Sequence, residues 1–307
     1  MSIALAVPTY NQSGLLREFL DRWVRHGAGR VPLIIVDDGS TDDTPEVLRR
    51  AAHPGLIVHR LPHVSAAHAR NHALRTAGTE WLAFTDTDCI LSPAYFEALA
   101  GLPGRFPTAA AVEGPVRPAA GPKPPFTHSL HNPGGSYATA NMVFRIRPIL
   151  DLGGFDEAFT ANFREDTDLA LTVLDRGLEI GFCPDLAVEH PHLPRPFLRS
   201  LRSAWATQDR VLRAEMRLYR KHPLSYGRVR HHRDARGTLA AWGRKYFALY
   251  FKECFRYVFR EPDIPIRSRL RALLPSAQAM IVALAEQACI VGMCMLKWKE
   301  IARLKQP

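Results

Sequence analysis

The chain has 307 residues, 47% of them hydrophobic, which suits one large domain or one domain with an appendage and excludes global disorder. The net charge of +10 is uneven, because residues 1–194 carry 16 Lys+Arg and 22 Asp+Glu, whereas residues 195–307 carry 24 and 8. The five cysteines are scattered and form no C-x-x-C pair, which argues against a disulfide framework and a zinc site and favours a reducing cytoplasm.

Alternating strands and helices are predicted for the first hundred residues. Apolar runs the length of buried strands occur at 2–7, 33–36, 56–59 and 81–84. Helices are expected at 14–26, from Asp43 or Thr44 onward with Pro45 in the first turn, at 65–76, and from Ser92-Pro93 onward. Strands and helices joined by such short connections predict an α/β fold with a mostly parallel sheet.

Three of these strands end in polar residues. The strand ends are Pro8-Thr9-Tyr10-Asn11, Asp37-Asp38 and Asp86-Thr87-Asp88. Because the carboxyl ends of parallel strands share one edge of the sheet, where such folds bind ligands, a nucleotide-type site is expected there. The first strand is followed by neither G-x-G-x-x-G nor a Walker A sequence, which excludes simple dinucleotide and P-loop sites. Asp86 and Asp88 offer hard oxygen ligands for Mg2+ or Mn2+, and a solvated turn is the alternative.

The next hundred residues start with a stretch rich in Pro and Gly, 102–136, which is expected to be a lid, a binding loop or a disordered segment. A strand at 137–145 and a turn at 153–157 should follow, and then a helix from Glu165-Asp166-Thr167-Asp168 to about Arg176. Short strands at 179–182 and 187–189 precede His190-Pro191-His192. Because the helix dipole favours acidic residues in a first turn, capping is the alternative to a catalytic role for Glu165 and Asp166.

Beyond Pro196, Arg-rich helices are expected at about 197–221, 237–260 and 265–303. The stretch 277–296 is apolar except for Gln278, Glu286 and Gln287. Inserting a central Glu into a bilayer costs on the order of 2–3 kcal/mol, so a core or amphipathic helix is expected rather than a membrane span. The basic and aromatic surroundings suit peripheral contact with an anionic membrane, and a solvated helical surface is the alternative. Nucleic-acid binding is not expected, because no recognised module is visible.

Taken together, the motifs resemble those of family 2 glycosyltransferases. They are, in order, Val7 to Asn11, Asp37 to Asp42, Ala69-Arg70-Asn71, Asp86-Thr87-Asp88, Gly153 to Glu157 and Glu165-Asp166. The resemblance covers about residues 2–192 and implies a GT-A fold, a Rossmann-like, mostly parallel sheet flanked by helices. The glycosyltransferase domain would span 1–194, with a nucleotide-binding half at 1–101 and an acceptor half at 137–194. A basic, helical C-terminal region would occupy 195–307.

The resemblance also implies an activity. One sugar would pass with inversion from a nucleotide-diphosphate sugar, most often UDP-linked, to a hydroxyl of a glycan or lipid-linked acceptor, with Mn2+ or Mg2+ assisting. The family's processive synthases carry Gln-x-x-Arg-Trp, whereas residues 199–209 hold Trp205 and Gln208 in another order, so a non-processive enzyme is expected. With no signal segment before the first strand, the expected location is cytoplasmic, peripheral at the inner face of the cell membrane.

Roles for single residues follow from the same resemblance. Thr9, Tyr10 and Asp38 would hold the nucleoside, beside Pro8, Asn11 and Thr87, and Asp38 would accept a hydrogen from the base. Asp37 and Arg70 would fix the base, ribose or diphosphate, and Asp86 would lie near the ribose. Asp88 would ligate the metal together with Asp86 and His190, and His192 is the alternative to His190. Asp166 would be the general base, flanked by Glu165.

Inverting transfer is a single displacement, so a carboxylate must take the proton of the acceptor hydroxyl while a metal and an Arg neutralise the leaving diphosphate. Asp88 and Asp166 are therefore expected on opposite sides of the donor sugar. A sugar-nucleotide pyrophosphorylase is an alternative, but Pro8 to Gly14 lacks the Gly-rich phosphate loop it needs. A non-catalytic sugar-nucleotide-binding or membrane scaffold protein is another, and the presence of both Asp88 and Asp166 argues against it.

Overall fold

The computed structural model describes residues 2–121, 127–159 and 163–194, together with 213–214, 217–218, 220–222 and 224–225. The chain divides into two compact units, residues 1–119, 130–191 and 222–229 in the first and the remainder in the second. In the second unit, β8 (Thr127–His128) pairs antiparallel with β12 (Leu193–Pro194). The apolar stretch 277–296 and nearly all of the expected C-terminal helices lie outside the described residues.

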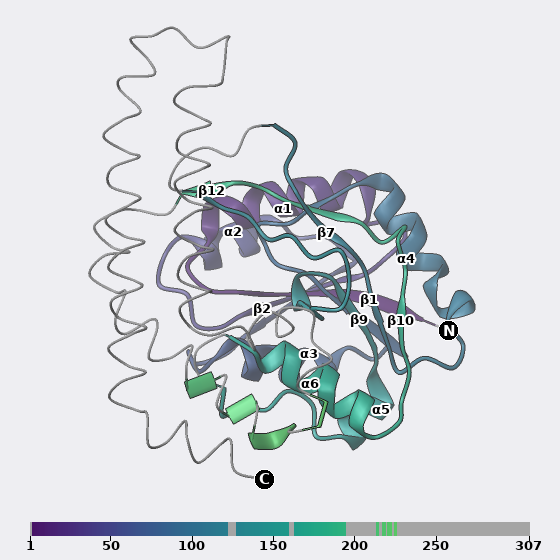
Figure 1. The fold of residues 1–307 in the computed structure, drawn as a ribbon. Coiled ribbons are helices and arrows are strands. Elements are labelled where there is room, and N and C mark those ends of the chain that lie inside the picture. Colours follow the sequence, from purple (N-terminus) through teal and green to yellow (C-terminus); the bar gives the residue numbers. More distant parts are fainter. Residues whose placement is uncertain are drawn as a thin grey trace, which may run out of the picture. The chain divides into compact units, whose positions relative to one another are not determined.

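A seven-stranded sheet, in the order β10-β6-β9-β4-β1-β2-β3, forms the centre of the first unit (Figure 1). Its strands are β1 (Ile3–Thr9), β2 (Leu33–Asp37), β3 (Leu56–Arg60), β4 (Trp81–Phe84), β6 (Ala111–Glu113), β9 (Met142–Arg145) and β10 (Ile180–Phe182). Neighbouring strands are parallel except at β9, which is antiparallel to both β4 and β6. The predicted mostly parallel α/β sheet is confirmed.

Helices cover both faces of this sheet (Figure 1). One face carries α1 (Ser13–His26), α2 (Thr44–Arg50) and α4 (Pro93–Arg105), and the other carries α3 (Ala66–Thr76), α5 (Ile146–Asp151) and α6 (Glu165–Asp175). Side chains alternate along β1, so that Leu5 and Val7 join the first hydrophobic core while Ala4 and Ala6 join the second. A strand that is buried on both faces must be apolar throughout, which explains the uninterrupted run in its sequence.

Two of the expected elements differ in the structure. The stretch 102–136, expected as a loop, contains the end of α4, then β6, β7 (Val116–Pro118) and β8. Strand β6 has only three residues, too few to stand out among Pro and Gly, yet it pairs with both β9 and β10. The strand expected at 137–145 begins only at Met142. Tyr137 has a φ of 58°, which extended backbone does not allow, and a 3-10 turn at Thr139–Asn141 follows it.

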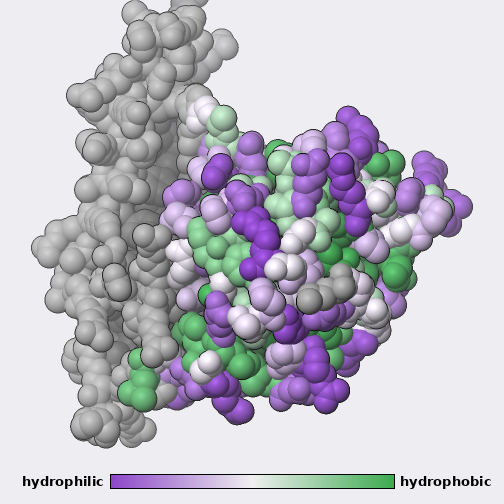
Figure 2. Space-filling view, turned by 90° about the vertical axis from the view of Figure 1, so that its right-hand side faces the viewer, coloured by the Kyte–Doolittle hydropathy of each residue, from purple (hydrophilic) through white to green (hydrophobic). Residues whose placement is uncertain are grey.

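The surface of the described part is mixed in character. Figure 2 shows one face of it, on which hydrophilic and hydrophobic residues are interspersed. The edge strand β3 leaves the side chains of Ile57 and Val58 partly open to solvent. None of the helices in the described residues is long and apolar enough to cross a membrane.

Candidate active site

The carboxyl ends of β1, β2 and β4 meet at one edge, because these strands are parallel neighbours. Thr9 pairs with Asp37 in the β1–β2 register, and the backbone N–H of Asp38 donates to the carbonyl of Thr9 at 2.9 Å. On the other side of β1, Ala6 pairs with Phe84, so Asp86 and the residues after it continue beyond the same edge. The predicted convergence of the three polar strand ends is confirmed.

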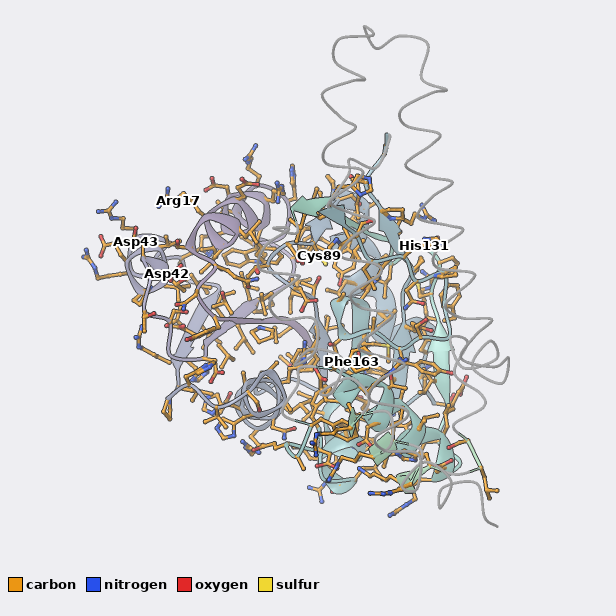
Figure 3. All side chains as sticks on the ribbon, turned by 60° about the vertical axis from the view of Figure 1, so that its left-hand side comes forward. Arg17, Asp42, Asp43, Cys89, His131 and Phe163 are labelled. Atoms are coloured by element: carbon orange, nitrogen blue, oxygen red, sulfur yellow. The ribbon has the colours of Figure 1, made fainter. Side chains whose placement is uncertain are left out.

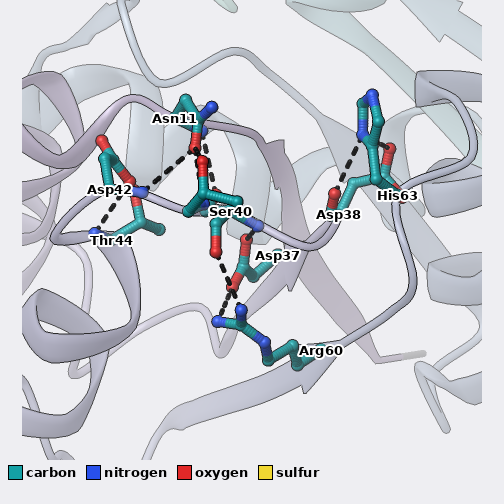
Figure 4. A network of polar contacts seen from close by, with 9 residues as sticks. Asn11, Asp37, Asp38, Ser40, Asp42, Thr44, Arg60 and His63 are labelled. Carbon is teal, nitrogen blue, oxygen red and sulfur yellow. Dashed lines mark hydrogen bonds and ion pairs between the residues drawn. The ribbon is translucent and has the colours of Figure 1, made fainter.

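A polar network joins the loop after β1 to the loop after β2 (Figure 4). The side-chain oxygen of Asn11 accepts from the N–H of Thr41 at 2.7 Å, and the N–H of Asn11 donates to the Ser40 hydroxyl at 2.9 Å. Asp42, near α1 and α2 in Figure 3, accepts from the backbone N–H groups of Ser13 and Thr44. Burial opposes ionisation of Asp42, but its bonds to Thr44 and Ser13 outweigh that effect and lower its pKa to about 2.

Asp37 and Arg60 hydrogen-bond to each other and to Ser40 of this network. Asp37 is 1% exposed, and its carboxylate accepts from Arg60 Nη1 at 2.8 Å and from the N–H of Ser40 at 2.9 Å. Arg60 also donates to the Ser40 carbonyl, and it lies opposite Asp37 in the β2–β3 register. These contacts fit a role for Asp37 in holding the loop. Arg60 was missed in the sequence because its partner is visible only once the strand register is known.

Asp38 and Tyr10 form a cluster with a residue that the motifs did not indicate, His63. The imidazole of His63 stacks on Tyr10 with ring centroids 3.9 Å apart and 15° between the planes. Its Nδ1 lies 3.1 Å from the Asp38 carbonyl and 3.2 Å from Asp38 Oδ2, while Asp38 Oδ1 accepts from the N–H of Val64. Tyr10 and Asp38, two of the three residues expected to hold the nucleoside, therefore share their stacking and hydrogen-bonding surfaces with His63.

The turn after β4 is fixed by its threonines. Thr85 donates to the Ala140 carbonyl at 2.9 Å, and Thr87, which is buried, donates to Gln12 Oε1 at 2.6 Å. The N–H of Cys89, a buried residue labelled in Figure 3, donates to the carbonyl of Asp86 and closes the turn. These bonds hold Asp86 and Asp88 in place beside the ends of β1 and β2.

Charged residues from both halves of the fold affect the pKa of Asp86. Its pKa is raised by removal from water and by the carboxylates of Asp88 and Asp166, against the lowering effect of Arg70 and His190. Its side chain keeps 39% of its surface exposed, so water screens part of these interactions. The expected donor-side and acceptor-side carboxylates are therefore within electrostatic reach of each other.

His190 reaches Asp88 because of a second, small sheet. In it, β11 (Val188–His190) pairs antiparallel with β5 (Ile90–Leu91), which directly follows the Asp86–Cys89 turn. His190 Nε2 lies 3.5 Å from Asp88 Oδ2, and its Nδ1 lies 2.8 Å from the Pro191 carbonyl. A carbonyl oxygen only accepts, so Nδ1 carries a hydrogen and Nε2 faces the carboxylate. Such a pair of facing atoms suits a shared proton or a shared cation.

The residues present fit a divalent cation with few protein ligands. No group of three or more His, Cys, Asp or Glu side chains in the described ranges is placed to hold a metal. Asp88 and His190 offer one oxygen and one nitrogen, and Mg2+ sites with substrate phosphates commonly use one or two protein carboxylates and several waters. His192, the alternative ligand, belongs to the second unit, where its two ring nitrogens are buried without a described hydrogen-bond partner.

Arg70 links the two groups of carboxylates. From α3, its Nη1 donates to Glu165 Oε1 at 2.8 Å, and its Nη2 lies 3.6 Å from Asp86 Oδ1. The side chains of Arg70 and Glu165 are 8% and 5% exposed. Burial and the neighbouring Asp166 raise the pKa of Glu165, and Arg70 opposes them. This buried pair joins the expected nucleotide-binding half to the start of α6.

The start of α6 presents Asp166 beside Glu165. Arg164 precedes the helix with a φ of 75°, and no described side chain caps this end. Asp166 Oδ1 accepts from the N–H of Thr167 at 2.6 Å.

Asn71, the residue after Arg70, connects α3 to the Gly153–Glu157 turn. Its side chain exchanges hydrogen bonds with the backbone N–H and carbonyl of Phe155.

Comparison with known proteins finds a family match over part of the chain. The family described as Glycosyl transferase family 2 matches residues 4–153. The chain is 28% identical over 213 residues to the pre-mycofactocin glycosyltransferase of Mycobacterium tuberculosis, a match that covers 62% of this chain and 43% of that protein. The chain thus spans less than half the length of this relative.

Solved structures resemble the chain at low sequence identity. A mannosyltransferase from Pyrobaculum calidifontis in complex with GDP-Man and Mn2+ matches with a TM-score of 0.51 and 21% identity, covering 92% of this chain and 86% of that one. Residues 1–349 of S. aureus TarS in complex with UDP-GlcNAc match with a TM-score of 0.52 and 15% identity, covering 96% and 92%. At these identities the likeness is one of fold.

Proposed function

We propose an inverting glycosyltransferase that uses a nucleotide-diphosphate sugar, because residues 4–153 match glycosyl transferase family 2 and the chain has the GT-A fold. One sugar per encounter would pass to a hydroxyl of a glycan or lipid-linked acceptor. The proposal rests on the position of Arg70, whose Nη1 donates to Glu165, the neighbour of Asp166, at 2.8 Å and whose Nη2 lies 3.6 Å from Asp86 Oδ1. It supports a single site that receives both the donor and the acceptor.

The residues divide the work in the proposed reaction. The carboxylate of Asp166 takes the proton of the acceptor hydroxyl as the oxygen attacks the anomeric carbon and the bond to the diphosphate breaks. Arg70 places a buried positive charge near Asp86, where it can stabilise the leaving diphosphate. Tyr10 and Asp38, with His63 beside them, offer a stacking surface and hydrogen-bond acceptors for the base.

Asp88 and His190, with Asp86 nearby, would hold a divalent cation. When bound, Mn2+ or Mg2+ supplies positive charge that stabilises the departing diphosphate. The mannosyltransferase from Pyrobaculum calidifontis in complex with GDP-Man and Mn2+ and the TarS complex with UDP-GlcNAc support a metal and a nucleotide sugar for this fold. A uridine donor stays the first candidate for testing, and a guanosine donor is the second.

Release of nucleoside diphosphate tests the proposal. The purified chain is incubated with Mn2+ and each of a panel of UDP- and GDP-sugars, with and without glycan or lipid-linked acceptors. Slow release without acceptor and faster release with it are expected from the wild type. Asp166→Ala should lower turnover about 10²–10⁴-fold, the contribution of a general base. Asp88→Ala should abolish the response to Mn2+. The control Asp21→Asn, at an exposed site on α1, should change neither turnover nor the response to Mn2+.

One outcome would reject Asp166 as the base, and another would reject catalysis altogether. If Asp166→Ala turns over at the wild-type rate, its assignment as base is wrong. If the wild type binds a nucleotide sugar but releases no nucleoside diphosphate with any acceptor, the chain is a sugar-nucleotide-binding or scaffold protein of the same fold.

We also propose peripheral contact between the basic residues 195–307 and an anionic membrane at the cytoplasmic face. Its support is compositional, since these residues lie almost entirely outside the described ranges. Flotation with vesicles of neutral or anionic lipid is the test. Binding that needs anionic lipid and weakens with salt is expected, and indifference to lipid charge would remove the proposal.

A further inference from the structure

A histidine far along the sequence contacts the helix that carries Asp166. His222 Nε2 lies 2.9 Å from Asp168 Oδ1, and its Nδ1 lies 2.7 Å from Asp175 Oδ2. The side chain of His222 is 4% exposed and that of Asp168 is 1% exposed. Carboxylates accept hydrogen bonds when ionised, so the two contacts are best satisfied when both ring nitrogens carry a hydrogen and the imidazole is charged.

The two partners of His222 share one face of α6. They are seven residues apart, which is about two helical turns. Asp175 is the last residue of the helix, where the dipole disfavours a carboxylate, and the imidazolium of His222 offsets that repulsion. Burial lowers the pKa of His222, but Asp168 and Asp175, the charged groups that act on it from α6, outweigh burial and raise it.

The carboxylates of α6 therefore have separate cationic partners. Glu165 pairs with Arg70, and Asp168 and Asp175 pair with His222, while Asp166 lies between them. Because Asp168 is only two residues from Asp166, any shift of the first turn moves both. A misplacement of about 1 Å at a reacting group can cost on the order of 10²-fold in rate.

We propose that His222 is a positioning residue that holds the first turn of α6, and with it Asp166, in place for proton removal from the acceptor. This role rests on the proposed function, because it assigns His222 to the orientation of the general base. His222 acts through α6 and touches no reacting atom. It lies in residues 222–229, which join the first unit although they follow its main body by thirty residues of sequence.

The expected pH dependence distinguishes positioning from simple structural support. A histidine whose folded pKa is raised above its unfolded value stabilises the fold fully below about pH 6.5, and this contribution is lost as the pH rises through the folded pKa. Turnover by the wild type should therefore fall on the alkaline side as His222 loses its proton. A variant without an ionisable group at this position should lack that limb.

The test compares His222→Gln and Asp168→Asn with the wild type in full-length protein, with His26→Gln on α1 as the control. The kcat and KM for nucleoside diphosphate release are measured between about pH 5 and pH 9. We expect His222→Gln to lower kcat about 10- to 100-fold at neutral pH with the donor KM nearly unchanged, and to remove the alkaline limb. The double variant His222→Gln/Asp168→Asn should be no slower than the slower of the two single variants, because both substitutions break the same contact.

A kcat within twofold of wild type together with an unchanged alkaline limb in His222→Gln would overturn the proposal. Backbone hydrogen exchange gives a readout that needs no turnover. If the wild type turns over no donor, the proposed function fails, and exchange at residues 165–168 then decides about His222 separately. Exchange at least tenfold faster in His222→Gln supports the positioning role of His222, and unchanged exchange rejects that role.

Discussion

Replacing Arg70 by Met should strongly destabilise the fold. The guanidinium is 8% exposed and lies between Glu165, at 2.8 Å, and Asp86, at 3.6 Å. Met keeps most of the volume of the aliphatic stem but leaves Glu165 as a buried carboxylate without its cation. Removing one partner of a buried ion pair costs about 3–5 kcal/mol, because the other charge stays desolvated and unpaired.

The assay is urea unfolding followed by linear extrapolation, with Arg75→Met as the control on the same helix. Arg75 is exposed, so its replacement should change the free energy of unfolding by less than about 0.5 kcal/mol. The double variant Arg70→Met/Glu165→Met should regain most of the loss, because an apolar pair of similar volume replaces the ion pair.

The loss should also depend on pH in a defined direction. Burial and Asp166 already raise the pKa of Glu165 against the effect of Arg70, so the pKa rises further without Arg70. An acid whose folded pKa is raised stabilises the fold below its unfolded pKa of about 4.3, and that contribution is lost as the pH rises. The deficit of Arg70→Met should therefore be smaller at pH 5 than at pH 8. A deficit under about 1 kcal/mol at neutral pH, or one that grows on acidification, would contradict a stabilising buried pair of Arg70 and Glu165.

Three further predictions concern the supports of the site. Glu113 is 3% exposed, and its carboxylate accepts from the side chain of Asn132 and from the N–H groups of Gly135, Ser136 and Tyr137. Glu113→Gln turns a donor toward these donors, so it should lower the free energy of unfolding in urea by about 1–3 kcal/mol. An unchanged free energy of unfolding would mean that these hydrogen bonds do not stabilise the loop. Gly154 has a φ of 73° and a Cβ there would lie 2.5 Å from Asn71 Oδ1, so Gly154→Ala should lower the stability by about 1–3 kcal/mol, and an unchanged melting temperature would contradict the turn geometry. Asp42 has a pKa of about 2, so its contribution is present above about pH 3.9 and lost as the pH falls toward 2; Asp42→Asn should flatten acid unfolding in that window, and an identical acid transition would exclude the contribution.

The central sheet and the shared edge of the site could be predicted from local sequence. The run Trp81 to Phe84 is a strand with those bounds, and the polar residues after it meet the ends of β1 and β2 as expected. Both predictions rest on a short-range signal, an apolar run that stops at a polar turn, and on the rule that parallel strands align their carboxyl ends.

The contacts that depend on register or on distant sequence could not be predicted. Arg60 reaches Asp37 only because β3 pairs with β2 in one register, and no spacing in the sequence gives that register. His63 lies beside Asp38 for a similar reason, after a turn that no motif marked. His222 is 54 positions from Asp168, and a lone histidine at that distance carries no local signal. The short strand β6 was hidden by its Pro- and Gly-rich surroundings.

The stereochemistry of donor hydrolysis tests most directly the claim that Asp166 drives a single displacement. Water serves as the acceptor, and proton NMR follows the anomeric signal of the released sugar before mutarotation mixes the anomers. An α-linked donor should give the β-sugar first, and Asp166→Asn should give none above background. First appearance of the α-sugar, or an undiminished rate in Asp166→Asn, would contradict a single displacement driven by Asp166.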